Sequence, residues 1–295
     1  MPKFGASERN IKDMFYEGVT FCYEGNQYEV IECGKPTCHK GEPKTDVYIL
    51  AEFKGHKREF KISFKQTNAD FIENKTNAER AEFILGKEWK NIIIDATTSI
   101  ADNFYARPLI YKKSHKKTGA GSITLGWKYE LLNKRGGELS GVVNLSREQV
   151  IDVYAGTHLP ADKKDASVNG QIIKNSGIAN FILVDENITD AQSVINSIVS
   201  IEEYVDIHPT VYFACKALNY RTFEERYDGN RPLSVFVDWS VIDGKLNGRL
   251  VFDAPLVTKG DMVADKLLKC LETLKINTTD DIDENTVTDS SIIIK

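Results

Sequence analysis

The sequence predicts an α/β protein, in which a mixed β-sheet flanked by helices is followed by an additional β-rich C-terminal part. Three observations lead to this fold class. Within the first 66 residues, short apolar segments alternate with a period of two residues around glycine turns. Segments with helical apolar spacing lie between and after these strands. From residue 122 onward, strand patterns become frequent again.

The bulk composition is that of a soluble globular chain. Its 295 residues are 41% hydrophobic and 27% charged, which suits one large domain or two modest ones. We expect a core over 1–110, a second part over 111–275 that could belong to the same domain, and an acidic, disordered tail over 276–295. No apolar run approaches the roughly 20 residues of a membrane span. The N-terminus lacks a signal-peptide core, and five scattered cysteines fit reduced thiols, so a cytoplasmic location without membrane contact is expected.

The first elements are a helix and two pairs of strands. A helix should begin after Ser7, a suitable N-cap, and end before Gly18. Two strands follow around Gly25-Asn26, and a loop rich in glycine and proline precedes the next pair. That pair covers 46–53 and 59–66.

The middle of the chain combines a helix, a loop and further strands. Apolar spacing predicts one helix over 68–86, with Asn68 as its cap and Gly86 as its stop. A basic, glycine-containing loop covers 112–122, and two strands should follow it.

The remaining elements are three helices, two strand turns and the tail. A helix capped by Ser146 is well signalled, and further helices are expected over 190–204 and 262–274. Between the last two, Asp243-Gly244 and Asn247-Gly248 indicate turns between strands.

The strands 46–53 and 59–66 form the most informative hairpin. We place its turn at Gly55 and His56, which fixes an antiparallel register with one wholly apolar face. The expected pairs on that face are Val47 with Phe64, Ile49 with Ile62, and Ala51 with Phe60. On the polar face, Asp46 and Lys65 become neighbours.

This arrangement resembles the core of the PD-(D/E)XK nuclease superfamily, which includes many restriction endonucleases. The resemblance rests on "PKTD", a hairpin, "ISFK" and a following helix, over about 60 residues. It implies a restriction-endonuclease-like sheet, a nuclease core over 1–110 and DNA recognition over 111–275. In such proteins an Asp at the start of one strand and an acid-x-Lys triplet on the next hold Mg²⁺ or Mn²⁺ and activate a water.

Two triplets compete for the acid-x-Lys position. Glu59-Phe60-Lys61 fits the letters, whereas Ser63-Phe64-Lys65 has a serine where the acid belongs. Geometry favours the second, because Glu59 would lie roughly 20 Å from the partner of Asp46 along the strand. The resemblance therefore implies Asp46 as metal ligand and catalytic residue, with Lys65 and Ser63 in the catalytic site.

A second metal-binding carboxylate is missing from this triplet and must come from elsewhere. Glu17, Glu32 and Glu73 are the donors we consider, and the sequence does not choose among them or the Glu59 alternative. Polar side chains beside the triplet are expected to contact DNA phosphates: Lys61, Gln66 and Asn68.

The charge of the whole chain does not favour a phosphate partner, but the charge of one segment does. The net charge is −5, but 35–65 carries eight Lys or Arg against four acids. Arginines in 219–233 fit either base readout or a corner in which they pair with Glu224, Glu225 and Asp228.

The leading hypothesis is a metal-dependent, sequence-specific endonuclease of the type II restriction class. Its partner would be double-stranded DNA, and the resemblance suggests a homodimer. The alternatives are a nuclease-like fold that binds nucleic acid without cutting it, a structural or assembly protein, and a plain surface ion pair between Asp46 and Lys65.

Overall fold

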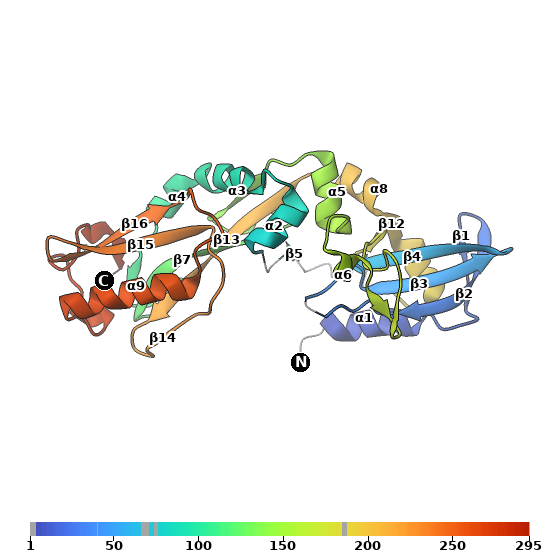
Figure 1. Ribbon diagram of the computed structural model, residues 1–295, viewed down its shortest axis with the longest axis horizontal. Coiled ribbons are helices and arrows are strands. Elements are labelled where there is room, and N and C mark those ends of the chain that lie inside the picture. The colour runs from blue at the N-terminus through green and yellow to red at the C-terminus, as the bar shows by residue number, and fades with distance from the viewer. Residues whose placement is uncertain (1–3, 40, 66–70, 74–75, 185–187, 295) are drawn as a thin grey trace. The chain divides into compact units, whose positions relative to one another are not determined.

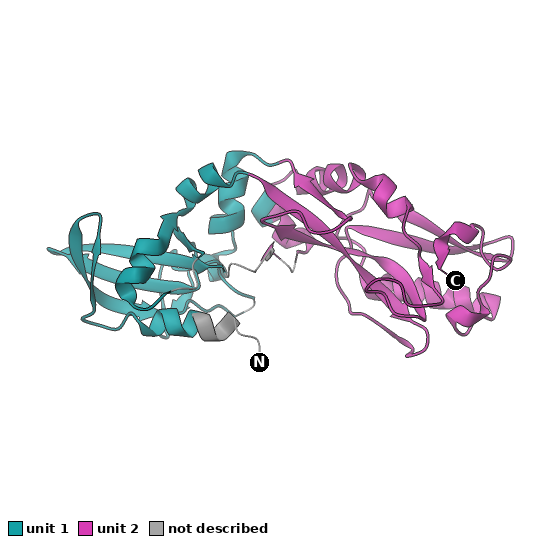
Figure 2. Cartoon of the chain, turned by 180° about the vertical axis from the view of Figure 1, so that it is seen from behind, with its two compact units in different colours: residues 1–70, 83–85, 145–209 teal, residues 71–82, 86–144, 210–295 magenta. Residues whose placement is uncertain are grey.

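The computed structural model (Figure 1) describes residues 4–39, 41–65, 71–73, 76–184 and 188–294. Two compact units divide the chain, and they interleave along the sequence (Figure 2). Unit 1 comprises 1–70, 83–85 and 145–209, and unit 2 comprises 71–82, 86–144 and 210–295. The expected division at residue 110 is therefore wrong, because 145–209 returns to the first unit.

Unit 1 is a mixed six-stranded sheet with helices packed on it. The strands run in the order β1-β2-β3-β4-β11-β12, in which β1 to β4 form an antiparallel meander and β11 pairs parallel with β4. A small hairpin, β9–β10, lies apart from the main sheet. The elements are α1 (Phe4–Asp13), β1 (Thr20–Tyr23), β2 (Asn26–Gly34), β3 (Val47–Phe53), β4 (His56–Phe64), α5 (Arg147–Ala155), α6 (Ala161–Lys164), β9 (Ser167–Val168), β10 (Gln171–Ile172), β11 (Phe181–Leu183), α7 (Ala191–Ser197), β12 (Ile198–Ser200) and α8 (Ile201–Ile207).

The apolar face of this sheet is the face that the alternation predicts. Val47, Ile49 and Ala51 of β3 share one buried cluster with Phe60, Ile62 and Phe64 of β4. Helices α1 and α7, together with Phe15 just after α1, cover this cluster through apolar side chains that belong to it; the helical members are Ile11, Ala191, Val194 and Ile195. The sheet and these two helices therefore enclose one core.

Unit 2 is built on a curled nine-stranded sheet whose main path is β14-β13-β7-β15-β16. Helix α9 packs on β15, whose Trp239 is fully buried and donates its indole N–H to the Thr124 carbonyl over 3.0 Å. The elements are β5 (Phe71–Glu73), α2 (Ala78–Leu85, which both units share), α3 (Trp89–Thr98), α4 (Ala101–Tyr105), β6 (Ile110–Tyr111), β7 (Ser122–Leu132), β8 (Ser140–Val143), β13 (Val211–Arg221), β14 (Arg226–Tyr227), β15 (Val235–Ile242), β16 (Lys245–Val251), α9 (Gly260–Leu274), η1 (Thr279–Asp281), η2 (Ser290–Ile292) and β17 (Ile293–Ile294). Mixed sheets and helices confirm the α/β class and the β-rich second part.

Three expected elements differ from the structure. The helix expected over 68–86 is only α2, because Asn77 caps it and 71–73 pairs with β7 as a strand. The helix expected over 190–204 is broken at Ile198, whose extended backbone joins β12 to β11. The turn expected at Asn247-Gly248 is instead the middle of β16. Tertiary pairing outweighs local spacing in each case.

The acidic tail is folded, which corrects the expectation of disorder. Its acids alternate with buried apolar side chains, and β17 pairs in parallel with β6. The Lys112 ammonium donates to the Asp280 carbonyl over 3.1 Å and to the Ile282 carbonyl over 2.5 Å. The buried members are Ile276, Ile282, Val287 and Ile293. The amino-acid composition of the tail does not reveal that its apolar residues are spaced so that they can be buried.

Ile282→Ala should therefore destabilise unit 2. Ile282 is fully buried, and removing such a side chain leaves a cavity that costs about 2–5 kcal/mol. Urea unfolding would measure the loss. Asp280→Ala, at an exposed position in the same segment, is the control and should change stability by less than about 0.5 kcal/mol. Equal, negligible effects of both changes would contradict a folded tail.

Candidate active site

The β3–β4 hairpin has a register two residues away from the expected one. Its turn is Lys54-Gly55, with φ of 50° and 81°, so the two strands pair Phe53 with His56 and Val47 with Ile62. A two-residue turn of this kind needs both residues in the left-handed region, which glycine adopts readily. A slip of two residues leaves the apolar and polar faces unchanged. Only the partners on each face change.

Asp46 consequently lies beside Ser63 rather than directly opposite Lys65. The Asp46 backbone N–H donates to the Ile62 carbonyl, and an Asp46 carboxylate oxygen accepts from the Phe64 backbone N–H, both over 2.8 Å. These two bonds continue the ladder past Val47 and fix the carboxylate at the end of β4. The predicted proximity of Asp46 to the triplet holds, although its pairing was wrong.

The Asp46 carboxyl is electrostatically strained. Burial raises its pKa from the ordinary 3.8 to about 6, and the nearby Glu8 carboxylate adds to this increase. The Lys65 ammonium opposes it most strongly, followed by the hydrogen bond from Phe64 and the charge of Lys35. A perturbed carboxyl beside a specific charge partner is a common feature of functional sites.

Lys65 is held at the point where three strands meet. It directly follows β4, and its backbone N–H donates to the Leu183 carbonyl at the end of β11 over 2.8 Å. Its side chain is partly buried, and its charge favours the ionised form of Asp46. The Lys65 charge therefore acts on the Asp46 carboxyl.

Glu8 of α1 supplies a second carboxylate, and sequence reasoning missed it. Its charge raises the pKa of Asp46, and it forms an ion pair with Lys35, which follows β2. The only signal in the sequence is an acid in the first predicted helix. Nothing in that pattern tells which end of the helix approaches the start of β3.

The donors considered from the sequence lie elsewhere. Glu17 and Glu32 line a cavity of about 390 Å³ between α1, β2 and Asn169. Neither is among the charges that perturb Asp46. Glu73 belongs to unit 2, where it forms an ion pair of 2.7 Å with Arg80.

The alternative triplet forms a separate group on the hairpin. Glu59 lies opposite Leu50 and accepts a 2.8 Å hydrogen bond from the buried Tyr48 hydroxyl. The Lys61 ammonium is 3.4 Å from Glu59, and only 12% of its side chain is exposed. Lys61 is therefore held in the sheet surface. Gln66 and Asn68, the other expected DNA contacts, lie outside the described residues.

Two buried hydroxyls flank Asp46. Ser63 and Thr45 are each 1% exposed, and neither hydroxyl has a hydrogen-bond partner within the described residues. An unpaired buried hydroxyl costs about 1–3 kcal/mol, so such groups call for an explanation in terms of strain or function. Thr45 precedes Asp46 in the chain, and Ser63 lies across the hairpin from it.

The site offers limited ligands for a divalent cation. Within the described ranges, no group of three or more His, Cys, Asp or Glu side chains is placed to hold a metal ion. Mg²⁺, however, is commonly bound through one or two carboxylates together with waters and substrate phosphates. Asp46 and Glu8, whose carboxylates interact electrostatically, are hard oxygen donors of the kind that this smaller set needs.

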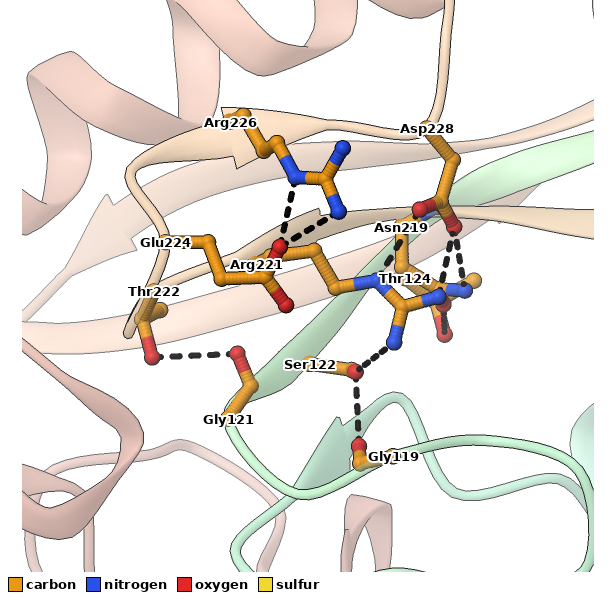
Figure 3. A network of polar contacts seen from close by, with 10 residues as sticks. All are labelled: Gly119, Gly121, Ser122, Thr124, Asn219, Arg221, Thr222, Glu224, Arg226 and Asp228. Atoms are coloured by element: carbon orange, nitrogen blue, oxygen red, sulfur yellow. Dashed lines mark hydrogen bonds and ion pairs between the residues drawn. The ribbon is translucent and has the colours of Figure 1, made fainter.

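The arginines of 219–233 include two that form ion pairs in a structured corner. Arg221 donates to both oxygens of Asp228, at 2.9 and 3.1 Å, and to the Ser122 hydroxyl at 3.1 Å (Figure 3). Asn219 also donates to Asp228, and Arg226 pairs with Glu224. Of the two interpretations, these contacts favour the structural corner over base readout for Arg221 and Arg226.

In the part of the chain that is described, no helix is long and apolar enough to cross a membrane. Comparison with protein-family profiles, characterised proteins and solved structures finds no match to this chain. The functional interpretation therefore depends on the geometry around Asp46.

Proposed function

We propose that the chain is a metal-dependent deoxyribonuclease that hydrolyses phosphodiester bonds in double-stranded DNA, in the manner of type II restriction endonucleases. The observation that carries this proposal is the electrostatic influence of Glu8 and Lys65 on the Asp46 carboxylate, which the Phe64 N–H fixes at the end of β4. The mixed sheet of unit 1 is consistent with it, because the two site strands are adjacent and β11 joins β4 in parallel.

Each charged side chain has a separate role. Asp46 and Glu8 would hold Mg²⁺ or Mn²⁺, which when bound neutralises phosphate charge and lowers the pKa of a bound water. Lys65 places a positive charge where negative charge develops on the attacked phosphate. Ser63, next to Asp46, adds a hydroxyl donor that has no partner among the described residues.

Plasmid cleavage tests the proposal. Unmethylated supercoiled plasmid, incubated with the protein and Mg²⁺ or Mn²⁺, should become nicked or linear, and chelation should stop the reaction. Lys57→Gln is a matched control, because Lys57 is exposed near the turn of the same hairpin. It should cut like the unaltered protein. Absence of cutting under every metal and sequence context tested would refute nuclease function.

A second candidate is a nucleic-acid-binding protein that does not cut. The observation that favours it is Ser63, which occupies the position of the second acid in the triplet. Salt-dependent binding of a duplex, with no cleavage and no metal binding, would support this candidate. A large oligomer that does not bind DNA would instead favour an assembly role.

A further inference from the structure

Lys35 occupies an unusual position in the candidate site. Its ammonium forms an ion pair with Glu8, and its charge also lowers the pKa of Asp46. The carboxylates of Glu8, Asp46 and Glu42 together raise the pKa of Lys35 itself, against the opposing effect of burial. Lys35 thus pairs with one carboxylate that would hold a metal, Glu8, and acts electrostatically on the other, Asp46.

The two carboxylates that would hold the metal are opposed by two lysines, and Glu42 adds a further negative charge near Lys35. Asp46 and Glu8 carry two negative charges when ionised, and Lys65 and Lys35 carry two positive charges. A divalent cation added to this set would leave an excess of positive charge at close range, which is unfavourable. Repulsion by the cation would therefore favour movement of one lysine away from the carboxylates.

Lys35 is the lysine that is free to move. Its side chain is 47% exposed, whereas Lys65 is partly buried and its backbone is bonded to β11. The backbone before Lys35 is closely packed, since a Cβ on Gly34 would lie 2.6 Å from a Val168 methyl and 2.8 Å from the Asn169 side-chain oxygen. Movement is thereby confined to the flexible four-carbon side chain of Lys35.

We infer that Lys35 is a positioning residue that exchanges partners: it binds Glu8 in the metal-free protein and a DNA phosphate once a divalent cation occupies Asp46 and Glu8. This inference rests on the proposed function. The exchange makes metal binding and DNA binding strengthen each other. When Lys35 leaves the Glu8 carboxylate, the DNA phosphate replaces that carboxylate as its anionic partner.

Binding measurements test this exchange without reference to cleavage. Mn²⁺ alone, followed by its paramagnetic resonance signal, should bind Lys35→Gln roughly fivefold more tightly than the unaltered protein, because the competing cation is gone. A short DNA duplex in Ca²⁺ should bind Lys35→Gln more weakly, with the slope of log affinity against log salt smaller by about 0.9. Lys35→Arg keeps the charge and should remain close to the unaltered protein in both measurements.

The control and the contrary outcomes separate this inference from the proposed function. Lys57→Gln removes the same charge near the hairpin turn and should leave Mn²⁺ affinity unchanged. Thermal melting would confirm that each variant is folded. Equal Mn²⁺ affinity in Lys35→Gln and the unaltered protein overturns the exchange alone. Failure of both to bind Mn²⁺ overturns the metal site, and the exchange with it.

Discussion

Asp46→Asn is expected to abolish cleavage and, at the same time, to stabilise the folded protein at neutral pH. Cleavage should fall at least about 10³-fold, because a charged ligand of the metal is lost and with it several kcal/mol of transition-state stabilisation. Stability should rise because the charge of Asp46 is unfavourable where it lies. Its pKa of about 6 means that the fold prefers the neutral form.

The pH dependence of this gain follows from the sign of the pKa change. A carboxyl whose pKa rises on folding stabilises the folded state most below its unfolded pKa, here 3.8, and this contribution is lost as pH rises through about 6. The difference between the two values corresponds to about 3 kcal/mol at most, and the partial solvent exposure of Asp46 reduces it to about 1–2 kcal/mol. Asn cannot ionise, so it avoids this loss.

Urea unfolding of both proteins at several pH values measures the effect. The stability difference should be small below pH 4, grow between about pH 4 and 6, and stay constant above. Asp13→Asn alters an exposed carboxylate of α1 and should show no such growth. An Asp46→Asn protein that is less stable than the unaltered one at pH 7.5 would show that the ionised carboxylate is structural.

The β3–β4 hairpin shows which structural features an alternating sequence pattern can predict and which it cannot. Alternation identified the apolar face of β3 and β4 correctly, because burial on one face leaves only registers of one parity. It could not select among registers that differ by two residues. That choice depends on Lys54, a non-glycine residue in the left-handed region, which no propensity indicates.

In the candidate site, too, the sequence predicts the residues that local strand pairing places and misses those that tertiary packing adds. Asp46 immediately precedes β3 and Lys65 immediately follows β4, so the pairing of these two strands, which can be predicted locally, sets where both residues lie. Glu8 and Lys35 join them through the packing of α1 and the end of β2, which no local pattern encodes. The folded tail was missed for a related reason. Its isolated apolar residues gain burial from strands that are distant in the sequence: Ile293 pairs with Ile110 of β6, and Val287 pairs with Leu246 of β16.

Lys65→Met is expected to lower cleavage by about 10²–10⁴-fold while leaving the fold intact. Methionine keeps the apolar side-chain stem but removes the charge that would stabilise the attacked phosphate. The strand end should be preserved, because Lys65 is anchored there through its backbone N–H. Lys57→Met makes the same chemical change at an exposed position of β4 and should retain full activity.

The same variant should also shift metal binding to higher pH. The Lys65 charge lowers the pKa of Asp46, so its removal should raise that pKa above about 6. Because a carboxyl must lose its proton to bind a metal, Mn²⁺ affinity should fall more at pH 6 than at pH 8. Lys65→Arg keeps the charge, so its Mn²⁺ binding should depend on pH as it does in the unaltered protein. If Lys65→Met binds Mn²⁺ with the original pH dependence, Lys65 does not act on Asp46, and the catalytic pairing of these two residues is wrong.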